Sequence, residues 1–173
     1  MSVKDITLIL KTCNKTKCVL FRLKQSLLLP SYTINSIVLD RPEFVKDLGV
    51  YLTPKLDFSF HCNHIANNAF RRSYLIFASF VSRDSNFLLK MYTTFIRPLL
   101  EYGSQVWSPY LKKNIEKIES VQHYFTRCIP GFRTLTYDEW LSLLNLPSLQ
   151  ARRLRADRLF LHKSTHFLPI VHL

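Results

Sequence analysis

The pattern of apolar residues changes near residue 54, and this change constrains the fold more than any other feature of the sequence. Before it, short runs rich in β-branched and aromatic residues alternate with Pro30 and Pro42, as in a set of short strands. After it, apolar residues recur at spacings of three, four and seven, which is typical of helices that pack one face on a core. The sequence therefore predicts an α+β protein, with a small antiparallel sheet followed mainly by helices.

The first 53 residues are predicted to form one helix and about four short strands. Ser2 and Asp5 have the spacing of a capping box, which predicts a short helix over residues 2–13. Asn35-Ser36 separates two β-type runs and predicts a tight hairpin, and Gly49 lies inside the last predicted strand. The strands are expected at residues 17–23, 32–34, 37–39 and 44–53.

Five helices are predicted after residue 54, each from an apolar stripe or from capping residues. Their expected ranges are 58–80, 86–99, 115–129, 137–144 and 148–167. Ser85 is the expected N-cap of the second helix, and Pro98 is expected to bend or end it. Pro130-Gly131 is expected to stop the third helix. Thr136 and Glu139 predict a capping box that opens the fourth helix.

The net charge points to a polyanionic partner. The chain carries 24 Lys and Arg against 12 Asp and Glu, a net charge of +12, and residues 147–173 alone carry five basic groups and one acid. A membrane partner is not expected, because the longest apolar run, Tyr74 to Val81, is far shorter than the roughly 20 residues that span a bilayer. Residues 6–10 are too short for a secretory signal, so an intracellular location, cytoplasmic or nuclear and not secreted, is expected.

Several basic side chains are candidates for contacts with a nucleic-acid backbone. Arg152, Arg155 and Arg158 recur every three residues on the last predicted helix, so they are expected to form a ridge that could follow phosphates. A solvated surface that keeps the protein in solution is the other interpretation. The full set of candidates is Arg71, Arg72, Arg152, Arg155, Arg158 and Lys163. The expected partner is RNA or an RNA–DNA duplex.

No catalytic residue and no metal site are predicted from the residues themselves. Asp138-Glu139 is the only adjacent acidic pair, and both residues fit the first turn of a helix, where acids favour the positive end of the dipole. His61, Cys62 and His64 have no spacing typical of zinc ligands. Cys62 falls on an apolar stripe, which favours a buried thiol with surface histidines.

A series of short motifs resembles the reverse transcriptases of LINE-type (non-LTR), jockey-like retrotransposons. The series matches the junction after the palm, the thumb and the helical region that follows it, from about residue 14 to residue 165. The order and spacing of the motifs carry the resemblance. They are VKDLGV (45–50), LDFS (56–59), IRPLLEYG (96–103), VWSPY (106–110), IEKIESVQ (115–122) and LPSLQARR (146–153). The resemblance implies a palm remnant over residues 1–53, a helical thumb-like domain over 54–135 and a basic helical extension over 136–173.

The resemblance also implies roles for particular residues. Residues 14–18 are similar to the family's Asn-x-x-Lys motif, which would place Lys17 near the incoming nucleotide. Leu48 and Gly49 are similar to the primer grip, whose backbone positions the primer end. The family's Tyr/Phe-x-Asp-Asp motif has no match, and it would lie before residue 1. The magnesium ions of the parent enzyme would therefore lack their ligands here, and a truncated RNA-directed DNA polymerase that is inactive alone, without a cofactor of its own, is expected.

Two other interpretations remain open at this point. The chain could be a module that binds RNA or RNA–DNA duplex without sequence preference. It could also be a decayed copy of an element with no selected function. In that case, strand edges that once paired with the rest of the palm are expected to be exposed and to promote self-association.

Overall fold

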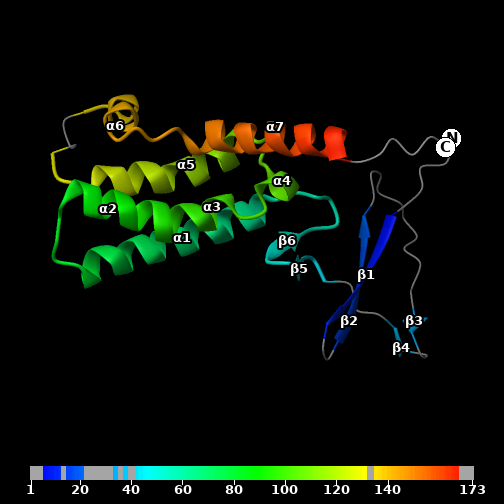
Figure 1. Ribbon diagram of the computed structural model, residues 1–173. Helices are drawn as coiled ribbons and strands as arrows, with labels where there is room; N and C mark the ends of the chain where they lie inside the picture. The colour runs from blue at the N-terminus through cyan, green and yellow to red at the C-terminus, as the bar shows by residue number, and fades with distance from the viewer. Residues whose placement is uncertain are drawn as a thin grey trace. The chain divides into compact units, whose positions relative to one another are not determined.

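The computed structural model describes residues 6–12, 15–21, 33–34, 37–38, 42–131 and 135–167. It confirms the α+β class, because short antiparallel strands precede residue 53 and helices dominate from residue 59 onward (Figure 1). The chain separates into two compact units, residues 1–61 and 62–173. The division into three parts at residues 53 and 135 stays a prediction.

Three antiparallel hairpins form the described strands of the first unit. Strands β1 and β2 pair over seven residues each, from Ile6 opposite Phe21 to Thr12 opposite Lys15. Ile34 pairs with Ile37 between β3 and β4, which confirms the hairpin predicted on either side of residues 35–36. The hairpins are β1 (Ile6–Thr12) with β2 (Lys15–Phe21), β3 (Thr33–Ile34) with β4 (Ile37–Val38), and β5 (Val45–Asp47) with β6 (Val50–Leu52). Self-association through their edges stays a prediction.

The helix predicted over residues 2–13 is wrong, because residues 6–12 form strand β1. The sequence of β1 is ITLILKT, which is rich in the β-branched residues that suit a strand. Its partner β2 begins after only two connecting residues, so every residue of β1 can pair with a residue of this nearby strand. Ser2 and Asp5, on which the helix prediction depended, lie outside the described residues.

The single strand predicted over residues 44–53 is also wrong, because the chain reverses at Leu48-Gly49. These residues have φ angles of 45° and 87° and connect β5 to β6 as a two-residue turn. Positive φ at both central residues is the requirement of a type I′ hairpin turn, which glycine meets without steric conflict. Leu48 adopts the left-handed conformation against its preference. Val45 and Val50, on either side of the turn, are buried.

The helices of the structure confirm the five predicted ones and add a short helix, α4. Residues 85–101 continue through a π-helical segment, η1, without a break. The elements are α1 (Ser59–Ser79), α2 (Ser85–Met91), η1 (Tyr92–Ile96), α3 (Arg97–Glu101), α4 (Ser104–Trp107), α5 (Lys112–Arg127), α6 (Tyr137–Leu143) and α7 (Leu149–Phe167).

The expectation that Pro98 ends the second predicted helix is wrong, because the helical stretch continues beyond it to Glu101. Pro98 sits in the first turn of α3, directly after η1, where its missing N–H removes the least hydrogen bonding. The wider π-helical turns before it relieve the crowding that a proline ring causes in an α-helix. At the other end of this stretch, the N-cap is Asp84 and not Ser85, since the Asp84 carboxylate accepts a hydrogen bond of 2.8 Å from the Phe87 N–H.

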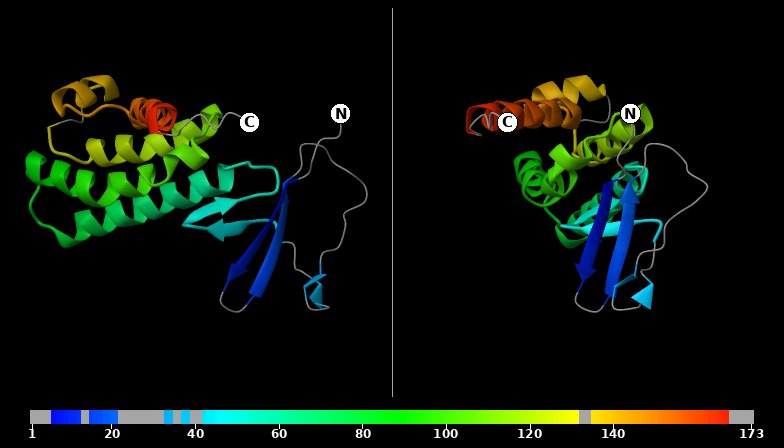
Figure 2. Two further views of the ribbon diagram at one scale, coloured as in Figure 1. Left: turned by 45° about the vertical axis from the view of Figure 1, so that its right-hand side comes forward. Right: turned by 90° about the vertical axis from the view of Figure 1, so that its right-hand side faces the viewer.

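The core of the second unit forms around α5, which contacts α7 through Glu119 and contacts α1 and η1 through Phe125 (Figures 1 and 2). The Phe125 ring contacts Phe77 of α1, with a centroid distance of 4.8 Å, and Tyr92 of η1, at 5.2 Å. Burial of each such side chain contributes about 1.5–3 kcal/mol. The fully buried side chains include Leu88, Tyr92, Ile96, Leu100, Trp107, Ile118, Phe125 and Leu149. Within the described residues, no helix is both long and apolar enough to cross a membrane.

Candidate nucleic-acid interface

The N-terminus of α7 is fixed by a carboxylate from α5. Glu119 accepts hydrogen bonds from the backbone N–H groups of Leu149, at 3.2 Å, and Gln150, at 3.3 Å. Ser148 adds a side-chain cap, because its hydroxyl accepts a bond of 3.1 Å from the Ala151 N–H. A carboxylate at this position also meets the positive end of the helix dipole, so the start of α7 is held firmly on α5.

A buried polar network supports the same carboxylate. The Tyr137 hydroxyl donates to Glu119 at 2.6 Å, and the amide of Gln122 donates to the Tyr137 oxygen at 3.0 Å and to the Pro147 carbonyl at 3.3 Å. The Tyr92 hydroxyl donates to the Gln122 carbonyl oxygen at 2.7 Å. Burial raises the pKa of both tyrosines, and the bond to Glu119 raises that of Tyr137 further. Both hydroxyls therefore stay protonated donors.

Arg152 of α7 is bound within the protein. Its guanidinium donates from Nε and Nη2 to the two carboxylate oxygens of Glu101, with an Nη2–Oε2 distance of 3.1 Å. This bidentate hydrogen bonding raises the pKa of Arg152. The ion pair thus directs the Arg152 side chain toward α3, although sequence periodicity grouped Arg152 with Arg155 and Arg158.

Arg153, a basic residue of the last helix that was not among the predicted phosphate contacts, is buried. Its side chain is 3% exposed, and burial lowers its pKa. Its Nη1 and Nη2 atoms, like Oδ1 of Asp157, have no hydrogen-bond partner in the structure. A signal was present in the sequence, since Arg153 follows the buried Leu149 by four residues and so shares its helix face.

The exposed cations of α7 lie beyond this anchored first turn. Arg155, Arg158 and Lys163 are all exposed. Arg155 and Arg158 are neighbours on the helix surface, and the eight residues from Arg155 to Lys163 extend over about 12 Å. We call these three residues the α7 cations. Asp157, the single acid of the helix, is only partly exposed.

The remaining two cation candidates lie on a different helix. Arg71 and Arg72 are exposed on α1, which lies away from α7 across α5 (Figures 1 and 2). Arg72 donates from Nη1 to the Phe95 carbonyl at 3.3 Å. The six candidates therefore form no single cluster: three are exposed on α7, two are on α1, and Arg152 is in an ion pair.

The residues assigned by resemblance lie in the first unit. The backbone of Lys17 pairs with Leu10 in the β1–β2 hairpin, and its side chain lies outside what the structure describes. Leu48 and Gly49 form the tip of the β5–β6 hairpin, where the Leu48 side chain is 83% exposed. Beside this hairpin, the Phe44 ring stacks on Phe60 with a centroid distance of 4.6 Å.

The histidine and cysteine candidates behave as structural residues. Cys62 is completely buried, as predicted, but the expectation of surface histidines is wrong for His61, which is 2% exposed. His61 Nδ1 accepts a hydrogen bond from the Tyr51 N–H at 3.3 Å, which explains why the ring turns inward. No group of three or more His, Cys, Asp or Glu side chains in the described part of the chain could hold a metal ion.

The acidic pair Asp138-Glu139 has the structural role that its position predicts. Both residues lie in the first turn of α6, and Thr136 with Glu139 forms the capping box. The Glu139 carboxylate accepts from the Thr136 N–H at 2.7 Å and from its hydroxyl at 2.8 Å. These two bonds lower the pKa of Glu139.

Comparison with known proteins finds two relatives of low identity. An uncharacterized protein of Caenorhabditis elegans is 27% identical over 113 residues, which is 64% of this chain and 57% of that protein. A probable RNA-directed DNA polymerase from transposon X-element of Drosophila melanogaster is 28% identical over 121 residues, 68% of this chain and 13% of the polymerase. The chain thus matches less than two thirds of either relative. No protein-family model and no solved structure matches it.

Proposed function

We propose that this chain is a C-terminal, thumb-like part of a non-LTR retrotransposon reverse transcriptase that holds RNA or RNA–DNA duplex by its phosphates. The similarity to a transposon polymerase over 68% of the chain supports the origin. The observation that supports the binding function is the arrangement of cations on α7. The first turn of α7 is fixed by Glu119 and by the Arg152–Glu101 pair, and Arg155, Arg158 and Lys163 extend from that anchor into solvent.

The chemistry of the α7 cations favours backbone contact over sequence recognition. Lysine and arginine on phosphates gain affinity by releasing condensed counterions, and this gain is the same for every sequence. A duplex presents one charge for about every 1.7 Å of its axis, so three cations that are spread over about 12 Å of α7 can reach several phosphates. Because α7 is a helix fixed at one end, the backbone that carries the cations is already ordered before they bind.

Within this proposal, the chain by itself is not a polymerase. Phosphoryl transfer by two metal ions needs converging carboxylates, and the sequence contains no Asp-Asp pair. The proposal includes the roles that the resemblance implies for residues of the first unit. Lys17 would lie near the incoming nucleotide. The Leu48-Gly49 turn would position the primer end. The turn would act through backbone groups, which a hairpin tip presents to solvent.

Binding is tested by fluorescence anisotropy with two labelled RNA–DNA hybrids of unrelated sequence and equal length. We expect the two affinities to agree within about threefold, and each to fall about 40-fold between about 50 and about 200 mM salt if three phosphates are neutralised. Affinity that differs strongly between sequences, or that does not respond to salt, would contradict the proposal.

The catalytic part is tested separately by primer extension. The purified chain, with magnesium, a primed RNA template and nucleoside triphosphates, is expected to incorporate no nucleotide. Template-dependent incorporation would show that the chain supplies its own metal ligands, and this part of the proposal would then be wrong.

A further inference from the structure

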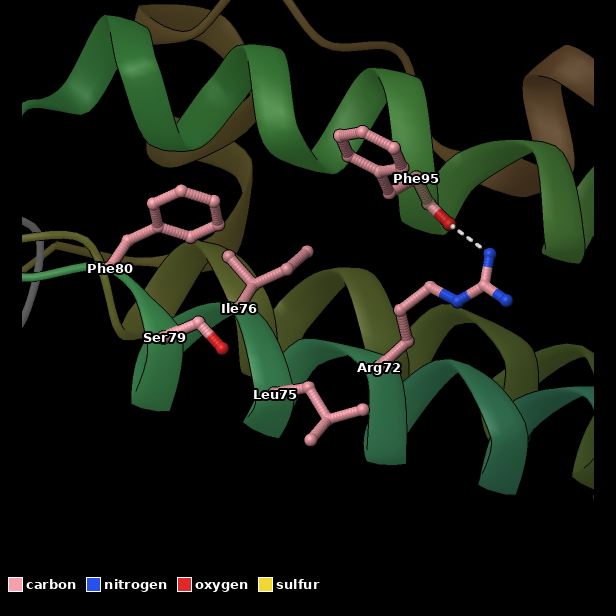
Figure 3. Close-up of a pocket in the computed structure, with 6 residues that line it drawn as sticks. All are labelled: Arg72, Leu75, Ile76, Ser79, Phe80 and Phe95. Carbon is pink, nitrogen blue, oxygen red and sulfur yellow. Dashed lines mark hydrogen bonds between the residues drawn. The ribbon is translucent and has the colours of Figure 1, made fainter.

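An open pocket lies between α1 and η1, far along the chain from the α7 cations. Its volume is about 230 Å³, and its lining is almost entirely apolar. Two of its aromatic rings are only partly covered, since Phe80 is 41% and Phe95 45% exposed. Figure 3 shows Phe80, Ile76 and Phe95 along the space between the two helices. The lining residues are Arg72, Leu75, Ile76, Ser79, Phe80 and Phe95.

A cation is fixed at one end of this pocket. The Arg72 guanidinium is held beside Phe95 by the bond of 3.3 Å from its Nη1 to the Phe95 carbonyl oxygen (Figure 3). A guanidinium has five N–H donors, so Nε and Nη2 remain for a ligand. The pocket therefore combines aromatic faces with a positive charge that is hydrogen-bonded to the backbone of Phe95.

The surroundings of the pocket are also basic. Residues 59–100, which form α1, α2, η1 and most of α3, carry five basic side chains and one acid. That acid, Asp84, is occupied as the N-cap of α2. An occupant with a negative charge is favoured at this site, and a cationic one is disfavoured.

We propose that this pocket takes one unpaired nucleobase of a single-stranded nucleic acid, stacked against Phe95, while Arg72 binds the adjoining phosphate. A nucleotide carries a flat apolar face next to an anionic group, which is the combination that the pocket offers. Stacking of this kind tolerates any base, because every base has a π-face. The inference rests on the proposed function for its class of partner, but it uses a different surface.

An acidic amphipathic helix of a protein partner fits the pocket less well. A helix in a groove is recognised through a row of anchors at i, i+3, i+4 and i+7, which extends for about 10 Å along its axis. The pocket's volume of about 230 Å³ is enough for one flat group but not for four such anchors. The test below therefore includes an acidic helical peptide, whose binding would favour a protein partner instead.

The test compares two labelled 12-residue strands that bind to the full-length chain. One is oligo(dT), and the other has the same backbone with abasic sites in place of every base. We expect oligo(dT) to bind about tenfold more tightly at the same salt concentration. Phe95→Leu, which keeps an apolar side chain but removes the π-face, is expected to abolish this difference without changing the affinity for the abasic strand. Arg72→Gln is expected to weaken binding of both strands.

Tyr74→Leu is the matched control. Tyr74 is an aromatic residue of α1 that is 67% exposed and does not line the pocket. It is expected to leave the tenfold difference intact, and circular dichroism checks that each variant is folded. The inference is overturned if wild type binds both strands equally or not at all, or if Phe95→Leu retains the difference. It is also overturned if an acidic amphipathic helical peptide binds in a Phe95-dependent manner and competes with oligo(dT).

The two proposals fail in distinguishable ways. If the hybrid duplex does not bind but the base-dependent difference persists and depends on Phe95, the duplex-binding function is wrong and the pocket inference stands. If the duplex binds through the α7 cations but no base dependence is found, only the pocket inference is wrong.

Discussion

Arg152 of α7 and Glu101 of α3 form a bidentate ion pair. The two residues are 51 positions apart in sequence, and their pair joins the two helices. The pair is partly covered, with side-chain exposures of 34% and 24%. Arg152→Ala is therefore expected to lower the free energy of unfolding by about 1 kcal/mol, between the values for exposed pairs and for hydrogen bonds to charged groups. It is expected to leave the salt dependence of duplex binding unchanged.

Urea unfolding measures the first effect, and Arg155→Ala is the control, because Arg155 is exposed. If Arg152→Ala flattens the salt dependence while Arg155→Ala does not, then Arg152 contacts phosphate and the ion pair opens on binding.

The buried amide of Gln122 is expected to be more important for stability than any surface charge. Gln122→Leu removes an acceptor for the Tyr92 hydroxyl and a donor to the Pro147 carbonyl, and the Gln122 and Tyr92 side chains are both completely buried. Buried polar groups left without partners cost about 1–3 kcal/mol each, so we expect a loss of about 2–4 kcal/mol in the free energy of unfolding. Gln150→Leu, at an exposed position, is the matched control. Equal effects of the two substitutions would contradict the network.

The capping box of α6 predicts a dependence of stability on pH. The bonds from Thr136 lower the pKa of Glu139 below its usual value, so the ionised carboxylate stabilises the folded state. This stabilisation is fully present above the ordinary pKa of a glutamate, near 4.5, and is lost as the pH falls through the lowered value. Glu139→Gln is expected to lower the urea midpoint at pH 7, and the gap to wild type is expected to close as the solution becomes acidic.

Asp138→Asn separates the hydrogen bonds from the charge alone. It removes an acid from the same turn but leaves the capping box intact. If it reproduces the pH dependence of Glu139→Gln in full, the helix dipole and not the capping box is the cause.

Burial predicts different reactivities for two cysteines. In a variant with Cys13→Ser and Cys18→Ser, the exposed Cys128 is expected to react rapidly with a thiol reagent such as DTNB. Cys62, which is completely buried, is expected to react only at the rate at which the protein unfolds. Rapid reaction of two thiols per chain would show that the start of α1 is open in solution.

Features encoded by neighbouring residues could be predicted from the sequence. The α1 helix follows from an apolar stripe, and the start of α6 follows from Thr136 and Glu139 three residues apart. The turn at Leu48-Gly49 could not be predicted, because leucine rarely adopts the positive φ that the turn requires. Strand β1 could not be predicted because Ser2 and Asp5 have the spacing of a helix capping box, whereas the strand depends on pairing with residues 15–21.

Features that depend on distant residues could not be predicted. Arg152, Arg155 and Arg158 are three residues apart, so the sequence predicted the same phosphate-binding role for all three. Arg152 differs only because Glu101, which is distant in sequence, lies close enough to form an ion pair with it. The same holds for Gln122, whose partners lie 15 to 30 residues away. The pocket beside Arg72 depends on the position of Phe95 in η1, and the apolar stripe predicted a helix over these residues but not its π-helical turns.

The most direct test of the account is the salt dependence of hybrid-duplex affinity in two variants that lose the same charge. One replaces Arg155, Arg158 and Lys163 by Gln, and the other replaces the exposed Lys90, Lys113 and Arg127 by Gln. At about 0.9 per cation, we expect the slope of log K against log salt to flatten by two to three in the first variant and to keep its wild-type value in the second. Equal slopes in both variants would contradict binding through α7.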